Sequence, residues 1–181
     1  MPPNSHQPDI EFAPAPAGNR VRIITAVTLP LIAVVLAVGI ALTPLRGRHG
    51  VWPALIAPAF LVPMIAVFWL AARIRSYRLV GGTLVVDRAL LTTRFPLAGL
   101  TEAVRDRDAL QGAVKLYGNG GLGAIAGRFR SRRLGPFRAY VTDRENAVVL
   151  RWPERCLVVS PAQPGWFLDS VRRRAGLTSP R

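Results

Sequence analysis

Three glycines in the second half of the chain follow a spacing that can bind a phosphate group. Gly118, Gly120 and Gly123 form G-x-G-x-x-G after an apolar stretch, and Asp143 lies twenty residues beyond the last of them. In a dinucleotide-binding fold, such glycines let the backbone approach a pyrophosphate at a helix N-terminus, and the acid binds the ribose. That fold needs strands that alternate with helices, whereas the segments before Gly118 are spaced as hairpins. We therefore interpret the glycines as an inter-strand loop and predict no cofactor.

Arginines cluster directly after these glycines, and aromatic residues are interleaved with them. The predicted lipid or partner surface consists of Arg128, Arg130, Arg132, Arg133 and Arg138, beside Phe129 and Phe137. Cations next to a bilayer attract anionic headgroups, and cations with aromatic rings can also bind nucleic acid. Three interpretations stay open: a solvated charged loop, a surface for anionic lipid, and a surface for a protein or nucleic-acid partner. Of the ligands, lipid is favoured over nucleic acid if the chain lies at a membrane.

The acidic residues of the same half do not suggest a metal site. Glu102, Asp106 and Asp108 alternate with Arg105 and Arg107. A hard cation needs several convergent oxygens, and interleaved arginines compete for them. This pattern indicates a solvated turn whose charges pair with one another.

Histidine and cysteine are scarce as well. His6 lies near the N-terminus and His49 between two apolar runs, so the C-terminal half contains no imidazole for general-base or zinc chemistry. Cys156 is the single cysteine, and within CLVVS it is typical of a core position. We predict no catalytic residue, no metal ligand and no enzymatic activity.

Two uncharged apolar runs precede these residues. They cover Ile23–Leu42 and Val51–Ala72 and are separated only by TPLRGRHG. A membrane-spanning helix needs about 20 apolar residues, and each run is long enough. A connector this short permits only an antiparallel pair, so residues 21–73 are predicted to form a transmembrane hairpin. A cleaved signal peptide fits less well, because the first run is long and a second follows at once.

Arginines near the ends of the two runs predict their orientation. The connector contains Arg46 and Arg48, whereas five arginines flank the other ends: Arg20, Arg22, Arg73, Arg75 and Arg78. Because basic residues concentrate on the cytoplasmic side, both termini are predicted to be cytoplasmic. Arg73, Arg75 and Arg78 are expected to anchor the junction between membrane and domain. The net charge of +14 agrees with a partner that is anionic.

The rest of the chain divides into two tails and one domain. Residues 1–20 are rich in proline and alanine and are predicted to be disordered, and residues 176–181 form a C-terminal tail. Residues 75–175 contain short β-rich segments about ten residues apart, which favours a small antiparallel barrel or sandwich. The segments are Tyr77–Val80, Thr83–Asp87, Ala89–Arg94, Leu100–Arg105, Phe137–Thr142, Ala147–Trp152 and Cys156–Ser160.

A single helix is predicted to close this domain. Pro164 suits its first turn, Phe167 and Val171 share a face, and Gly176 can end it. Trp166 and Phe167 are expected to plug an open end of the barrel.

Two groups of strands followed by one C-terminal helix resemble the bacterial pleckstrin-homology (PH) domain family, in the form attached to a membrane hairpin. The similar segments are YRLVGGTLVV, YGNGGLGAIAGRF, LGPFRAYVT and CLVVSPAQPGWFLDSV. The resemblance implies a PH-like barrel that binds or scaffolds rather than catalyses. It does not imply phosphoinositide binding, because the first turn, Gly81-Gly82, has no cation.

The sequence therefore predicts a membrane-anchored α+β protein of the bacterial plasma membrane, with a cytoplasmic PH-like module after a two-helix hairpin. Its partners would be the bilayer, anionic headgroups, or a membrane protein or second copy of the chain. The alternative is a small accessory subunit of a membrane complex that assembles through the hairpin, with the domain regulating assembly.

Overall fold

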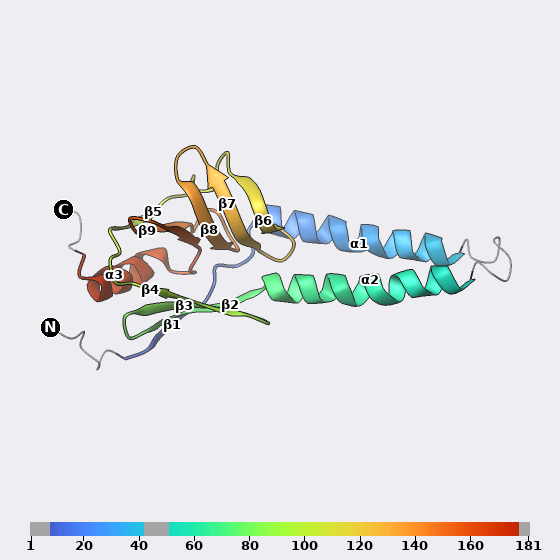
Figure 1. Cartoon of the computed structure of the whole chain (residues 1–181), viewed down its shortest axis with the longest axis horizontal. Helices are drawn as coiled ribbons and strands as arrows, with labels where there is room; N and C mark the ends of the chain where they lie inside the picture. The colour runs from blue at the N-terminus through green and yellow to red at the C-terminus, as the bar shows by residue number, and fades with distance from the viewer. Residues whose placement is uncertain (1–7, 42–50, 178–181) are drawn as a thin grey trace.

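A computed structural model describes residues 8–41 and 51–177 of the chain. Two long helices project together from one end of a β-rich domain that a third helix closes (Figure 1). The helices are α1 (Asn19–Ala41), α2 (Val51–Ala72) and α3 (Pro164–Ala175). The strands are β1 (Ile10–Phe12), β2 (Ile74–Val80), β3 (Thr83–Arg88), β4 (Thr92–Pro96), β5 (Glu102–Arg105), β6 (Val114–Gly120), β7 (Ile125–Ser131), β8 (Gly135–Val141), β9 (Val148–Arg151) and β10 (Cys156–Val159).

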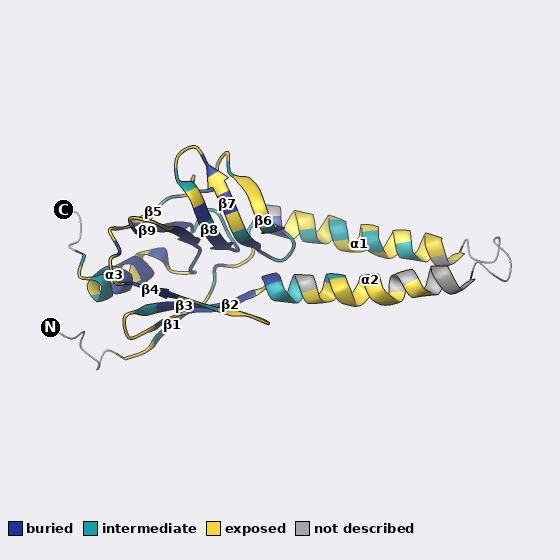
Figure 2. Ribbon diagram, viewed as in Figure 1, coloured by how far each residue is buried: buried dark blue, intermediate teal, exposed yellow. Residues whose placement is uncertain are grey.

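The two projecting helices are apolar and largely exposed. Within the described residues, Val21–Gly39 of α1 is long and apolar enough to cross a membrane, and only 6% of that stretch is buried. In α2, the shorter stretch Ala59–Ala72 is apolar, and α1 and α2 contact each other. Figure 2 shows both helices mainly in the colour of exposed residues. Such exposure sets α1 apart from the buried core helix of a soluble protein. The connector with Arg46 and Arg48 lies outside the described residues.

A strand that precedes α1 joins the strand that follows α2. Ile10 pairs with Leu79 and Phe12 with Tyr77, so β1 extends an antiparallel sheet of order β1-β2-β3-β4. Phe12 is buried, and its ring lies 5.1 Å from that of Phe167. This ordered strand differs from the disorder predicted for residues 1–20, of which residues 1–7 lie outside the described part. The physical reason is that Phe12 and Ala15 are buried, β1 pairs with β2, and the backbone at Ala15 and Gly18 donates to the carbonyls of Ser160 and Thr142.

The second sheet is six-stranded and is not purely antiparallel. Its order is β5-β9-β10-β8-β7-β6. The hairpin of β9 and β10 inserts so that β10 runs parallel to β8, with Val158 beside Ala139. The sequence predicts an antiparallel barrel or sandwich, and the described strands form two separate sheets rather than a closed barrel. The antiparallel part of the prediction is wrong for one strand pair, β8 and β10, which is parallel.

The middle of the domain is strand, not loop. Residues from Tyr117 to Arg138 belong largely to β6, β7 and β8, and only a tight turn separates β6 from β7. A loop was predicted there because glycines and arginines are frequent. Cross-strand register overrides that local preference: Gly118 pairs with Gly127, and Arg128 pairs with Arg138.

Several predicted elements are confirmed. The turn at Gly81, where φ is +54°, joins β2 and β3, and Gly176 ends α3 in the left-handed conformation. Phe167 is fully buried against Phe12 and Tyr77, so its predicted place in the core is confirmed, although it packs between two sheets and not in the end of a barrel. Trp166 differs from the prediction that it lies in the core: its side chain is 48% exposed, and its ring contacts that of Phe12.

Tyr77 links the two sheets through its buried hydroxyl. The hydroxyl donates to the carbonyl oxygen of Tyr140 at 2.7 Å and accepts from the backbone N–H of Ser160 at 3.3 Å. Burial raises the pKa of Tyr77 to about 12, because the charged phenolate is poorly solvated there. The side chain therefore stabilises the fold only while it is neutral.

Replacing Tyr77 with phenylalanine should lower the free energy of unfolding, because a buried carbonyl and a buried N–H lose their partner. The expected loss is about 1–3 kcal/mol, or about 2–12 °C in Tm. Wild-type stability should fall as the pH rises from 10.0 to about 12, since the unfolded state releases the Tyr77 proton first. Thermal unfolding of the full chain in uncharged detergent measures both effects. Tyr117→Phe, at an exposed position, is the matched control, and identical pH profiles for wild type and Tyr77→Phe would contradict the assignment.

Candidate functional site

Two arginines occupy the core-facing side of the six-stranded sheet. Side chains alternate between the faces of a strand, so residues two apart share a face. On β7, Arg128 lies two residues after Ala126, and on β8, Arg138 lies two residues before Tyr140. Ala126 and Tyr140 belong to the core between the sheets. Arg128 and Arg138 also face each other in register, so the inner face ends in a cross-strand pair of like charges.

These arginines line a groove where the edge strand β4 meets the six-stranded sheet. One cavity, of about 430 Å³, lies between Phe95 and the strands β7, β8 and β10. A second, of about 620 Å³, shares Arg128 and Arg138 with the first and extends to Ala71 and Ala72 at the end of α2. We call the two together the arginine groove. Its basic residues are Arg88, Arg94, Lys115, Arg128, Arg138 and Arg155.

The charge of this groove is strongly one-sided. Of the residues that the structure describes, Glu154 is the one carboxylate that lines either cavity. Among the described residues, the ion pairs involve none of Arg94, Arg128 and Arg138. Like charges in a partly enclosed space repel more strongly than in water, because the effective dielectric constant is lower. The groove is therefore complementary to a multiply charged anion.

Aromatic rings and carbonyl groups hold two of the cations in place. The guanidinium of Arg155 lies 4.5 Å from the centre of the Trp152 ring and donates to the carbonyl oxygen of Pro96 at 2.8 Å. The guanidinium of Arg88 lies 5.1 Å from the centre of the Tyr140 ring and donates to the Thr93 hydroxyl at 3.4 Å, while its buried Nε has no partner among the described residues. Such contacts orient a guanidinium without neutralising it, so its charge stays available to an anion.

The structure divides the five arginines that the sequence singled out. Arg128 and Arg138 lie in the groove. Arg130 is exposed further along β7, opposite Pro136. Arg132 and Arg133 lie in the turn between β7 and β8, where Arg133 pairs with Asp106. Four basic residues of the groove were missed, because only the fold brings their elements beside β7 and β8: Arg88 on β3, Arg94 on β4, Lys115 on β6 and Arg155 in the turn between β9 and β10.

The three predicted junction anchors also have different surroundings. The guanidinium of Arg73 lies 4.6 Å from the centre of the Trp69 ring, at the end of α2. Arg75 is exposed on β2. Arg78 donates to Asp87, and this hydrogen bond holds the pKa of the Asp87 carboxyl below its ordinary value. Arg78 is therefore engaged within the four-stranded sheet.

The glycine pattern has a packing role. A Cβ on Gly118 would lie 2.3 Å from the carbonyl oxygen of Ala126, so β6 and β7 approach closely only because both strands contain glycine. Gly123 packs against the Trp69 ring, and its N–H donates to the Thr25 hydroxyl at 3.1 Å. Strand β7 follows these glycines, whereas a dinucleotide site needs a helix N-terminus at that point.

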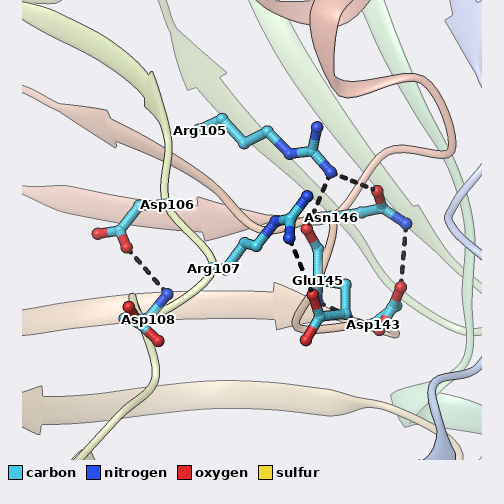
Figure 3. Close-up of polar contacts among 7 residues, drawn as sticks. All are labelled: Arg105, Asp106, Arg107, Asp108, Asp143, Glu145 and Asn146. Carbon is cyan, nitrogen blue, oxygen red and sulfur yellow. Dashed lines mark hydrogen bonds and ion pairs between the residues drawn. The ribbon is translucent and has the colours of Figure 1, made fainter.

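The acidic residues near β5 form ion pairs with arginines outside their own turn: Glu102 with Arg151 and Asp106 with Arg133. Arg105 donates to Asn146 and to the carbonyl of Glu145, and Arg107 pairs with Glu145 (Figure 3). Asp106 accepts from the backbone N–H of Asp108. The expected self-pairing is therefore wrong in its partners. Within the described ranges, no three His, Cys, Asp or Glu side chains gather as ligands for a metal ion.

Arg128→Gln should stabilise the protein, because it removes the like-charge pair with Arg138. Such a pair costs about 0.2–1 kcal/mol, so the expected rise in Tm is about 0.5–4 °C at low ionic strength. Added salt should reduce the difference. Arg130→Gln is the matched control, because Arg130 lies opposite Pro136 and should leave Tm unchanged. A fall in Tm for Arg128→Gln alone would mean that the guanidinium has a stabilising partner.

Comparison with known proteins agrees with the fold. Residues 75–175 match the family model described as Bacterial PH domain. No curated protein and no solved structure matches the chain. Because the family model covers more than half of the sequence, the chain belongs to the bacterial PH domain family.

Proposed function

We propose that this protein is a membrane-attached, non-enzymatic PH module that binds the phosphate of an anionic lipid headgroup in the arginine groove. Domains of this family are typically binding modules without catalytic activity. The observation that carries the proposal is the charge of the groove, where six basic residues meet a single carboxylate at the domain end of α2.

The membrane attachment is supported first by the two projecting helices. Their outward residues are large and apolar, such as Ile23, Phe60 and Met64, the second of which is 75% exposed. Water disfavours so much exposed apolar surface, whereas hydrocarbon accepts it. We propose two spans, at about residues 23–42 and 51–72, in the bacterial plasma membrane.

The segment before α1 supports an anchor over a cleaved signal. Strand β1 lies upstream of α1 and pairs with β2, so removal of α1 with its upstream segment would strip Phe12 from the domain core. The same pairing holds the chain before α1 and the chain after α2 in one sheet. With five arginines at this end and two in the connector, we propose that both termini are cytoplasmic.

The position of the groove favours a lipid as the source of the phosphate. Its second cavity reaches Ala71 and Ala72, the last residues of α2, and includes exposed Leu91. If α2 ends at the membrane surface, this end of the groove opens at headgroup level. Arginine suits the ligand because its planar guanidinium donates two parallel hydrogen bonds to a phosphate.

Binding of short-chain lipids to the full chain in uncharged detergent micelles tests this function. We expect dioctanoyl phosphatidic acid to bind and dioctanoyl phosphatidylcholine to bind far more weakly. Arg128→Gln with Arg138→Gln should weaken phosphatidic acid binding about tenfold or more, since each charge-assisted hydrogen bond contributes about 1.5–3 kcal/mol. Microscale thermophoresis measures the affinities.

The matched control changes the same charge outside the groove. Arg132→Gln with Arg133→Gln removes two cations from the β7–β8 turn and should leave the affinity unchanged. If both double variants weaken phosphatidic acid binding equally, the lipid is attracted by the overall positive charge of the surface and not by the groove. If the groove variant binds with wild-type affinity, the groove is not the binding site. Glycerol 3-phosphate, which has the phosphate without the chains, shows whether a soluble phosphate ester binds as tightly as the lipid.

A further inference from the structure

A separate cavity lies where the two projecting helices meet the domain. It has a volume of about 800 Å³ and is lined by the first turns of α1, the last turn of α2 and Gly123 of the β6–β7 turn. None of its lining residues lines the arginine groove. We call it the junction pocket.

The β6–β7 turn packs against both helices beside the junction pocket. A Cβ on Gly123 would lie 2.9 Å from Nε1 of Trp69, and a Cβ on Gly121 would lie 2.6 Å from Cδ1 of Ile24. The N–H of Gly123 donates to the hydroxyl of Thr25 on α1. The β6–β7 turn thus touches both helices, so the pocket has a defined shape.

One end of the pocket offers hydrogen-bond donors and positive charge. Arg22 and Arg73 line it, and no acidic residue does among those that the structure describes. Within the same described part, Nε1 of Trp69 is buried without a hydrogen-bond partner, and the Arg73 guanidinium lies over the indole ring. A buried donor left unpaired costs about 1–3 kcal/mol, so an acceptor at this point stabilises the site. Two guanidinium groups and an indole N–H together fit an anionic oxygen group.

The other end of the pocket is apolar. Leu29 and Pro30 line it further along α1. At about 1.5 Å per residue, Pro30 lies roughly 12 Å beyond Arg22 along the helix axis. The lining therefore changes from cationic to hydrocarbon along the direction in which α1 leaves the domain. A phospholipid at a membrane surface changes in the same order, from phosphate to acyl chain.

We propose that the junction pocket binds one anionic phospholipid, whose phosphate contacts Arg22, Arg73 and the Trp69 indole N–H and whose acyl chain follows α1 past Leu29 and Pro30. This inference rests on the proposed membrane attachment but not on the arginine groove. The bound lipid would tie the helix pair to the domain at the membrane surface.

Quenching of Trp69 fluorescence by brominated lipid tests the proposal. The full chain is mixed in uncharged micelles with phosphatidylglycerol or phosphatidylcholine brominated near the glycerol end of the acyl chains. The Trp69 signal is the difference between wild type and Trp69→Phe. We expect several-fold stronger quenching by brominated phosphatidylglycerol than by brominated phosphatidylcholine at equal mole fraction.

Three variants assign the preference to this pocket. Arg22→Gln with Arg73→Gln should abolish the preference for phosphatidylglycerol, whereas Arg73→Lys should largely retain it. Arg128→Gln with Arg138→Gln removes the same charge from the arginine groove and should leave the preference for phosphatidylglycerol unchanged. The proposal for the junction pocket can therefore be supported even if the proposal for the groove is contradicted. Equal quenching by the two lipids, or a preference that survives the loss of Arg22 and Arg73, would overturn the proposal. Absence of quenching by either lipid would overturn both the pocket and the membrane contact.

Discussion

The pairing of β1 with β2 is the constraint on which the rest of the molecule depends. It joins the segment upstream of α1 to β2, the strand that follows α2, in one sheet. The residues that follow β1 then cross to the other sheet: Ala15 N–H donates to the carbonyl of Ser160, and Gly18 N–H to that of Thr142. The Thr142 hydroxyl in turn donates a hydrogen bond to the carbonyl oxygen of Ala15. These bonds close one side of the sandwich with backbone from outside the matched family region.

The opposite side of the sandwich is closed differently. At the β4 edge, the inner face of the six-stranded sheet ends in Arg128 and Arg138. Further along the same two strands, the same face contains the core residues Ala126 and Tyr140. Apolar residues in place of the two arginines would extend the core and avoid charge repulsion. The arginines instead leave a charged groove that the fold itself does not require. Binding sites commonly reduce stability in this way, because groups arranged for a ligand are not arranged for one another.

Local signals in the sequence explain which elements could be predicted. Residues close together in the sequence determine the β2–β3 hairpin and α3. These residues are Gly81 in the turn, Pro164 at the start of the helix and Gly176 at its end. Strands β6 and β7 could not be predicted, because their order comes from a close approach of Gly118 and Gly127, which in the sequence resemble loop residues. Of the six basic residues of the groove, the sequence singled out Arg128 and Arg138. The other four lie on β3, β4, β6 and in the turn between β9 and β10, and the packing of the two sheets places them beside β7 and β8.

The glycine-rich hairpin connects the two proposed sites. Its turn packs on Trp69 and Thr25 at the ends of α2 and α1, and its second strand contains Arg128. Between them, the Gly118–Gly127 contact holds β6 and β7 so closely that a side chain at either position would force them apart. The distance from the helix ends to the groove is therefore determined by backbone contacts, which vary less than side-chain rotamers. A spacing that resembles a phosphate-binding loop in the sequence instead lets β6 and β7 pack closely, between the helix ends and Arg128.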